Sequence, residues 1–209
     1  MTLTNKQYYY PNNMGRIILL ALEDIIGQKF INTLLNGENL SHVLDCIPPT
    51  NFDRQFSFEY LSQMMACIES AYGPRAGRGL ALRSGQACFK YGLREFGPMI
   101  GVSDMAFRLL PLSTKLTKGA NLFAGAFNQY SDQEVRVEED GEHIYWHIDR
   151  CPICWQRQSD QPTCHLAVGI LQESLYWVSG GKNFLIEETD CIAKGDSSCT
   201  IEINKQPLS

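Results

Sequence analysis

The chain has 209 residues, of which 44% are hydrophobic and 20% charged, as in an ordinary globular protein that buries its own core. Its formal net charge of -5 gives no positive field for a nucleic-acid backbone, so we expect no nucleic-acid partner. The polar, tyrosine-rich amino terminus does not look like a targeting signal, and no apolar run reaches the roughly 20 residues that span a bilayer. We therefore expect a cytoplasmic protein without a membrane span.

The first half of the chain has apolar residues at helical spacing. Asn13 is suited to cap the start of a first helix, and Asn36-Gly37 its end. A second helix should begin near Ser57 and end at Gly73-Pro74. A third is expected over 80–96, and a fourth over 103–127, where a proline at position 111 should break it.

The third predicted helix has one stripe of small residues and one of bulky residues. The small stripe includes Gly85 and Cys88, and the bulky stripe includes Phe89. Glycine inside a helix costs about 1 kcal/mol relative to alanine, so these positions need a reason in packing or binding. Close approach of another helix is one reading, and space for a ligand is the other.

Beyond residue 130 the apolar period changes from helical to alternating. Residues 134–138 and 143–148 alternate as half-buried strands do, and Asp140-Gly141 between them predicts a two-residue hairpin turn. That turn places Val137 opposite Ile144 and pairs the two histidines of the second strand with glutamates of the first. The remaining predicted elements are a helix over 162–179, a strand over 184–188, a turn over 194–196 and a strand over 199–203.

These elements predict an α+β fold in which a helical amino-terminal half packs on an antiparallel sheet with one inserted helix. We expect a single domain over 1–209, with the helical part at about 12–130 and the sheet part at about 131–205.

Eight cysteines in a chain expected in a reducing compartment favour metal or redox chemistry over disulfides. Five of them lie between positions 151 and 199. Thiolate and carboxylate ligands near the predicted hairpin and helix start could close a tetrahedral metal site from Cys164, Glu188, Cys191 and Cys199. Cys151 and Cys154 form a Cys-Pro-Ile-Cys turn, which leaves zinc, an iron–sulfur cluster and simple buried thiols all open.

The motifs Cys151-Pro-x-Cys154, Pro-x-Cys164-His165 and Glu188-x-x-Cys191 followed by Gly195-Asp196-x-x-Cys199 resemble the 4-vinyl reductase domain family. The resemblance covers roughly residues 151–203. It implies a fold like that of vesicle-tethering subunits, and a structural zinc held by Cys164, Glu188, Cys191 and Cys199. Family members include hydrocarbon-binding proteins, sensor domains of phenol-responsive activators and an accessory protein of bacteriochlorophyll biosynthesis.

No Gly-x-Gly-x-x-Gly fingerprint and no phosphate-binding loop occurs in the sequence, so we expect a binding protein and not an enzyme. The leading hypothesis is a metal-containing sensor or carrier for a hydrophobic, aromatic or tetrapyrrole-like ligand. The residues expected to contact the ligand are Gly85, Phe89, Phe123, Phe127 and Trp146.

Two alternatives remain open: an iron–sulfur electron-transfer or redox-sensing protein, and an assembly or accessory factor in bacteriochlorophyll biosynthesis. We also expect a homodimer, in which a Tyr8–Pro11 arm packs on the second subunit. Because the chain has no output domain of the kind that activators carry, a sensor of this kind would act through a protein partner.

Overall fold

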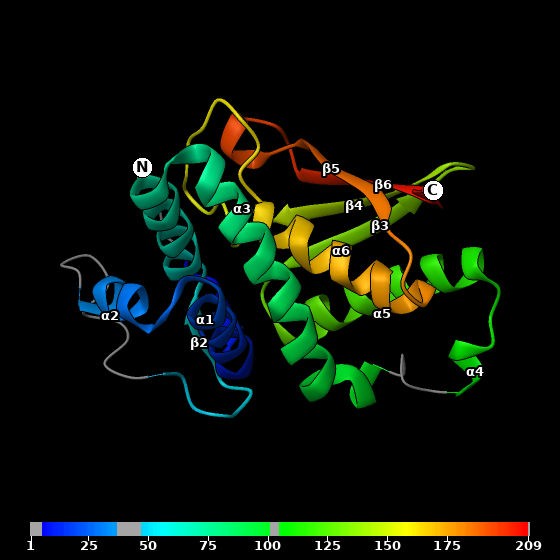
Figure 1. Cartoon of the computed structure of the whole chain (residues 1–209), viewed down its shortest axis with the longest axis horizontal. Coiled ribbons are helices and arrows are strands. Elements are labelled where there is room, and N and C mark those ends of the chain that lie inside the picture. Colours follow the sequence, from blue (N-terminus) through cyan, green and yellow to red (C-terminus); the bar gives the residue numbers. More distant parts are fainter. Residues whose placement is uncertain (1–5, 37–46, 101–104, 209) are drawn as a thin grey trace.

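The computed structural model describes residues 6–36, 47–100 and 105–208. The fold is α+β, as predicted, with the helical first half beside an antiparallel sheet (Figure 1). None of the described helices is both long and apolar enough to cross a membrane.

The amino-terminal arm forms a small sheet with its own chain. Strand β1 (Tyr9–Pro11) pairs antiparallel with β2 (Arg54–Ser57), and the backbone N–H of Phe58 donates to the Tyr8 carbonyl at 2.9 Å. The ring of Tyr10 meets that of Phe58 edge-on at 5.2 Å. The arm is therefore held by hydrogen bonds within its own chain, and the homodimer stays a prediction.

Two of the predicted helix boundaries differ from the structure, and both differences lie at glycines with positive φ. The first predicted helix is two helices, α1 (Asn12–Ile26) and α2 (Gln28–Asn36), separated by Gly27 at φ 99°. The second and third are the two arms of one kinked helix, α3 (Phe58–Ile100), with the kink at Gly73, where φ is 78°. Only glycine adopts such a φ without strain, so each glycine turns the chain where the helical pattern is interrupted.

Helices α4 (Met105–Arg108) and α5 (Leu112–Tyr130) lie on either side of the proline at position 111, as predicted. The inserted helix α6 (His165–Ser179) ends at Gly180, which has a left-handed backbone conformation. Helices α3 and α6 make the most extensive helix–helix contact of the described chain.

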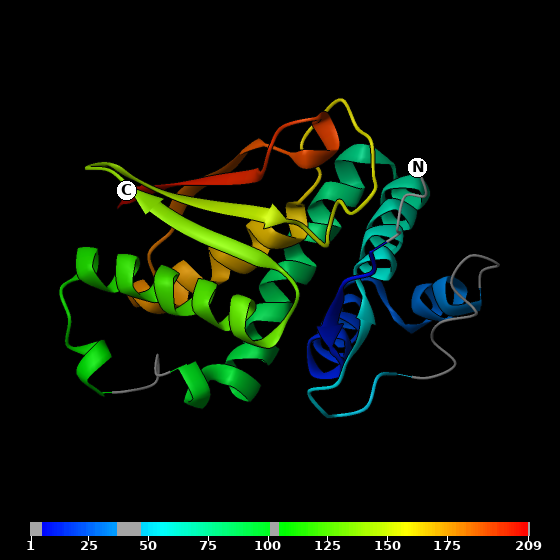
Figure 2. The same cartoon turned by 180° about the vertical axis from the view of Figure 1, so that it is seen from behind.

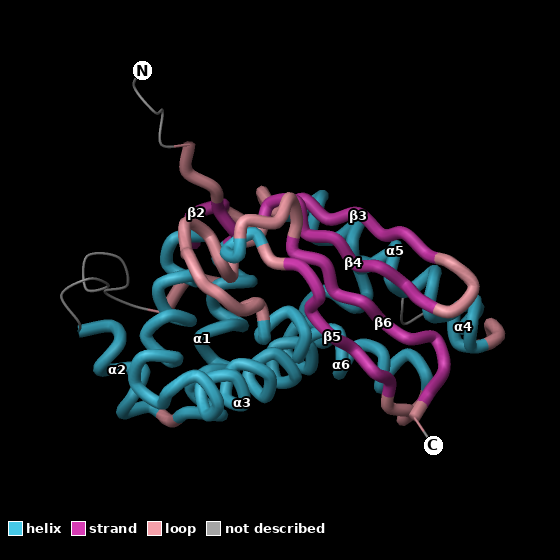
Figure 3. Tube along the Cα trace, turned by 90° about the horizontal axis from the view of Figure 1, so that it is seen from above, coloured by secondary structure: helices cyan, strands magenta, loops and turns pink. Residues whose placement is uncertain are grey.

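The main sheet has the strand order β3-β4-β6-β5, and all its pairings are antiparallel. Its strands are β3 (Glu134–Glu139), β4 (His143–Arg150), β5 (Phe184–Asp190) and β6 (Cys199–Pro207). A short 3₁₀ helix (Ile192–Lys194) lies between β5 and β6. Helices α5 and α6 cover one face of the sheet (Figures 2 and 3).

The register of the β3–β4 hairpin is shifted by two residues from the predicted one. Val137 lies opposite Trp146, and Glu139 lies opposite Ile144. The cause is Asp140, whose Oδ1 accepts from the backbone N–H of residues 142 and 143 at 2.8 and 2.7 Å and so occupies the first position of the turn. A shift of two leaves each side chain on its predicted face.

The predicted partners of the two histidines, Glu138 for His143 and Glu134 for His147, are shifted in the same way, and the β3 glutamate beside His147 is Glu138, with Oε2 3.8 Å from His147 Nε2. His147 lies opposite Arg136, and its Nδ1 is 3.0 Å from Thr200 Oγ1 on β6. The nearest acidic partner of His143 Nε2 is Glu202 of β6, at 3.3 Å.

Candidate functional site

A cavity of about 120 Å³ lies between helices α1, α3, α5 and α6 and the covered face of the sheet. Four of the five residues predicted to contact a ligand line it: Phe89, Phe123, Phe127 and Trp146. Their rings form a connected set, with centroids 5.9 Å apart for Phe89 and Phe123, 5.1 Å for Phe123 and Phe127, and 5.9 Å for Phe123 and Trp146. Rings at these distances and tilts make favourable contacts beyond their burial.

The fifth predicted contact, Gly85, does not line the cavity. A Cβ on Gly85 would lie 2.2 Å from the carbonyl oxygen of Leu166, and one on Gly169 would lie 2.0 Å from that of Leu82. The two glycines therefore let the backbones of α3 and α6 touch. Of the small stripe on α3, Cys88 and Gly92 face the cavity instead.

The polar groups at the cavity wall are all neutral. The Tyr10 hydroxyl donates to Gln133 Oε1, and burial raises the pKa of Tyr10 well above its usual range. Burial also raises the pKa of the Cys88 thiol to about 12. Ser174 Oγ donates to the Leu171 carbonyl at 2.8 Å. Among the described lining residues, none is a histidine and none is charged at neutral pH.

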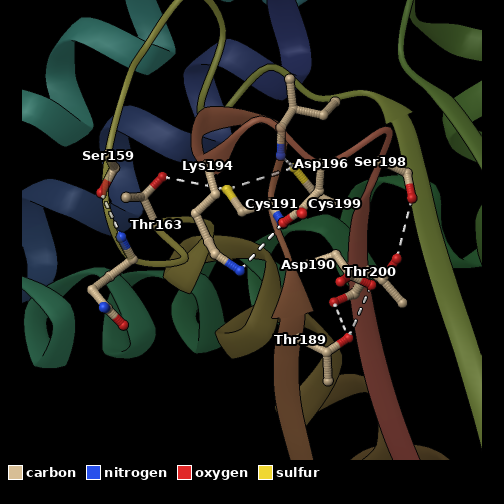
Figure 4. Close-up of polar contacts among 12 residues, drawn as sticks. Ser159, Thr163, Thr189, Asp190, Cys191, Lys194, Asp196, Ser198, Cys199 and Thr200 are labelled. Atoms are coloured by element: carbon tan, nitrogen blue, oxygen red, sulfur yellow. Dashed lines mark hydrogen bonds and ion pairs between the residues drawn. The ribbon is translucent and has the colours of Figure 1, made fainter.

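A second site lies at the end of the sheet, where five thiols and one carboxylate meet. Cys151 and Cys154 belong to the loop after β4, Cys164 directly precedes α6, and Cys199 begins β6. Glu188 lies in β5 and Cys191 just after that strand. The five cysteines are buried, and Figure 4 shows Cys191 and Cys199 facing each other across the β5–β6 connection.

The six predicted metal-ligating residues are thus together in space. The closest sulfur pairs are Cys151 with Cys164 and Cys154 with Cys199, each at 3.4 Å. Cys164 Sγ lies 3.6 Å from Cys199 Sγ, and Cys191 Sγ lies 3.9 Å from each of these two. We refer to these five cysteines and Glu188 as the thiol cluster.

Glu188 has an uncompensated oxygen. Its Oε2 accepts from the backbone N–H of Cys164 at 2.7 Å, whereas Oε1 is buried without a hydrogen-bond partner. Burial, with the nearby Cys191 as the next cause, raises the pKa of Glu188 to about 9. A buried polar atom without a partner costs free energy. A proton or a cation bound to this oxygen would remove that cost.

Among the described residues, backbone N–H groups donate to the cluster, and no lysine or arginine is hydrogen-bonded to its sulfurs. The N–H of Ile192 donates to Cys199 Sγ at 3.3 Å. The ammonium of Lys194 pairs with Asp196 Oδ2 at 3.3 Å, and the same oxygen accepts from the N–H of Cys191 at 2.8 Å (Figure 4). Burial lowers the pKa of His165 to about 4, so this residue stays neutral.

Comparison with known proteins gives structural matches only. No protein-family model and no curated protein matches this sequence. An H-NOX protein from S. oneidensis, solved in an Fe(II)NO ligation state, matches with a TM-score of 0.60 at 14% identity and covers 93% of this chain and 99% of its own. An H-NOX mutant from K. algicida matches with a TM-score of 0.59 at 12% identity, over 95% of this chain and 97% of its own.

The phenol-responsive sensory domain of the activator PoxR matches less well, with a TM-score of 0.48 at 17% identity, over 70% of this chain and 73% of its own. At these identities the H-NOX matches establish the fold that the chain shares with them. The similar structures are H-NOX (heme nitric oxide/oxygen binding) domains and not 4-vinyl reductases, so the resemblance inferred from the cysteine motifs is wrong.

The expected cofactors are corrected by the same comparison. The similar structures are described with Fe(II), heme or porphyrin, and not with zinc or an iron–sulfur cluster. The expectation of zinc or an iron–sulfur cluster as the cofactor is therefore wrong, and so is the redox hypothesis built on the cluster.

The heme that the fold suggests does not fit the cavity of this chain. Heme iron is held by histidine, cysteine thiolate, methionine or tyrosine. The described lining offers no histidine to pair with its methionine, Met14, and Cys88 and Tyr10 are held in their protonated forms. The cavity is also smaller than the roughly 150 Å³ cavity that takes a single benzene ring in another protein.

Several lining residues were not predicted, notably Tyr10, Met14 and Ile153. Tyr10 reaches the cavity because β1 pairs with β2, which sequence periodicity does not reveal. Ile153 is the variable residue of the Cys-Pro-Ile-Cys turn, and its apolar side chain inside an otherwise polar loop was an available signal.

Proposed function

We propose that the chain is a small-molecule-binding sensor module and not an enzyme, and that its cavity takes a compact apolar ligand of about one aromatic ring. The observation that carries the proposal is the cavity of about 120 Å³ with its connected set of aromatic rings. An apolar cavity of about 150 Å³ stays dry and binds benzene, so this slightly smaller apolar cavity suits a ligand no larger than a single ring.

The shared fold supports a sensing role. The similar structures include H-NOX proteins, one with nitric oxide at Fe(II) and one described in terms of H-NOX activation. The size and neutral lining of the cavity argue against the tetrapyrrole-like ligand that we considered from the sequence. A ligand here would contact α3, α5, α6 and the sheet at the same time, so its binding would change the packing between these elements. A protein partner that binds one packing arrangement better than the other would respond to the ligand.

Tryptophan fluorescence tests the proposal directly, because two of the three tryptophans, Trp146 and Trp177, line the cavity. We expect benzene, toluene or phenol to change the emission in a saturable way, and hemin to give no stoichiometric complex. Absence of binding by every single-ring compound, or stoichiometric heme uptake, would contradict the proposal.

A pair of glycine variants provides the control. Gly92 lines the cavity and a Cβ there meets nothing within 4 Å, so Gly92→Leu should fill the cavity and weaken binding at least about tenfold, which corresponds to about 1.4 kcal/mol. Gly125 of α5 is exposed, and a Cβ there also meets nothing. Gly125→Leu should bind the ligand as the wild type does.

A further inference from the structure

The thiol cluster contains two four-residue metal-ligand sets that overlap. One set is Cys151, Cys154, Cys164 and Cys199, and the other is Cys164, Glu188, Cys191 and Cys199. In each set all the ligand atoms lie within 4.8 Å of one another. The two sets share Cys164 and Cys199, whose sulfurs are 3.6 Å apart.

The sulfur–sulfur distances match the edges of a tetrahedral site. A tetrahedral ion with metal–sulfur bonds of about 2.3 Å holds its sulfurs about 3.8 Å apart. The distances from Cys191 Sγ to the two shared sulfurs are both 3.9 Å. Cys151 Sγ lies 3.4 Å from Cys164 Sγ, and Cys154 Sγ lies 3.4 Å from Cys199 Sγ. These distances are close to a tetrahedral edge, and every other pair of ligand atoms within a set lies within 4.8 Å.

One tetrahedral ion would leave two of the six ligands unused. An ion in the all-cysteine set would leave Cys191 and the unpartnered Oε1 of Glu188 buried beside it. An ion in the set with Glu188 would leave Cys151 and Cys154 as buried thiols. Only two ions use every member, and the second ion also satisfies the Glu188 oxygen.

We propose that the thiol cluster is a binuclear centre for two thiophilic divalent cations, bridged by the thiolates of Cys164 and Cys199. Cys151 and Cys154 complete the coordination of one ion, and Cys191 and Glu188 complete that of the other. Thiolate ligands select soft and borderline metal ions.

Two divalent ions also balance most of the charge of the six ligands. Five thiolates and one carboxylate carry six negative charges, and the nearest lysine in sequence, Lys194, is paired with Asp196. Two divalent ions reduce these six charges to a net of two, which is also what one ion leaves on its own four ligands while the unused groups stay protonated, and backbone donors such as the N–H of Ile192 face the remainder. Charge therefore permits two ions, and the use of all six ligands is what favours them over one.

Such a centre would tie four segments of the chain together. The bridging sulfurs come from the start of α6 and the start of β6, and the terminal ligands come from the β4–α6 loop and from the end of β5. Removing the ions would release these segments from each other.

Cadmium is a suitable probe ion, and the test uses the full chain, reduced and freed of metal, titrated anaerobically with Cd²⁺. We expect native mass spectrometry to find two Cd²⁺ per chain and ¹¹³Cd NMR to show two resonances that are mutually coupled through the bridging sulfurs. A single Cd²⁺ with a single resonance, two uncoupled resonances, or no Cd²⁺ would each overturn the proposal. These readouts need no variant and do not depend on the cavity ligand.

Variants then assign the two positions. Cys151→Ala with Cys154→Ala should lower the stoichiometry from two to one, and so should Cys191→Ala. The matched control is Cys67→Ala, since Cys67 lies in α3 outside the cluster and should leave two Cd²⁺ bound. A stoichiometry that stays the same in the Cys151/Cys154 variant would place the ions elsewhere and overturn the assignment.

Discussion

The cavity and the thiol cluster are neighbouring regions with opposite chemistry. The cavity contains one cysteine, Cys88, whose pKa is raised to about 12 by its apolar surroundings. The cluster concentrates five cysteines and Glu188 within a few ångströms. The same residue type is an inert apolar group in one region and a candidate ligand in the other, and the number of ionisable neighbours decides which.

The two regions also differ in how the chain builds them. The aromatic rings of the cavity stand on helices and on the covered sheet face, whereas the cluster is made from loops and element ends. They nevertheless share a wall. Ile153, between Cys151 and Cys154, and Leu166, two residues after Cys164, both line the cavity. Metal binding that orders the cluster should therefore change the affinity of the cavity for its ligand.

The largest expected effect is a difference in how much ligand binding at each region raises the free energy of unfolding. Cd²⁺ at about 1,000 times its dissociation constant should raise the free energy of unfolding by about 4 kcal/mol for each bound ion, and so by about 8 kcal/mol for two. A single-ring ligand, limited by solubility to about ten times its dissociation constant, should add about 1.4 kcal/mol. Urea unfolding monitored by circular dichroism measures both. Equal or reversed effects would mean that the folded cluster binds Cd²⁺ no more tightly than the cysteines of the unfolded chain do.

A second prediction concerns the α3–α6 contact, which supports both regions. In Gly169→Ala the new Cβ would lie 2.0 Å from the Leu82 carbonyl oxygen, which is too close for a contact. Helices α3 and α6 must therefore separate. We expect a loss of about 3 kcal/mol of unfolding free energy, at the upper end for overpacking, together with weaker binding of both Cd²⁺ and the ring ligand.

The control for this variant is Gly79→Ala. Gly79 is also helical in α3, but a Cβ there meets nothing within 4 Å. Its replacement should gain up to about 1 kcal/mol from helix propensity. If Gly169→Ala instead matched this control, the close approach of α3 and α6 would not be a feature of the folded protein in solution.

Sequence patterns predicted much of the fold because most elements carry their own periodicity. The helices around the proline at position 111 and the four strands of the main sheet were all expected. The β1–β2 pairing was not, since three and four residues are too few to show a period. The hairpin register was missed because Asp140 takes the first turn position, a choice made by side-chain hydrogen bonds and not by alternation.

The site was predicted unevenly for a similar reason. Metal-type ligands are recognisable by residue type, so all six members of the thiol cluster were named in advance. Cavity residues are ordinary apolar residues, and only four of them were named, with Gly85 assigned wrongly because a glycine that admits a ligand and one that admits a backbone look alike in sequence. The H-NOX-like fold was beyond sequence comparison, since the similarity is 12–14% in identity.

The smallest predicted effect isolates the cavity thiol. Its folded pKa of about 12 lies above the ordinary value of 9.0, so the protonated thiol of Cys88 stabilises the fold fully below pH 9. This contribution is lost as the pH rises from 9 towards 12, because the unfolded chain then gains free energy by ionising. By pH 10 the loss should be about 1.4 kcal/mol. The Cys88→Ala variant lacks this thiol, and the pH dependence of the cluster is the same in variant and wild type. The excess of the wild-type unfolding free energy over that of the variant should therefore fall by about 1.4 kcal/mol between pH 8 and 10. A difference that stays constant over this range would mean that water reaches Cys88, and that the cavity is wetter than its apolar lining implies.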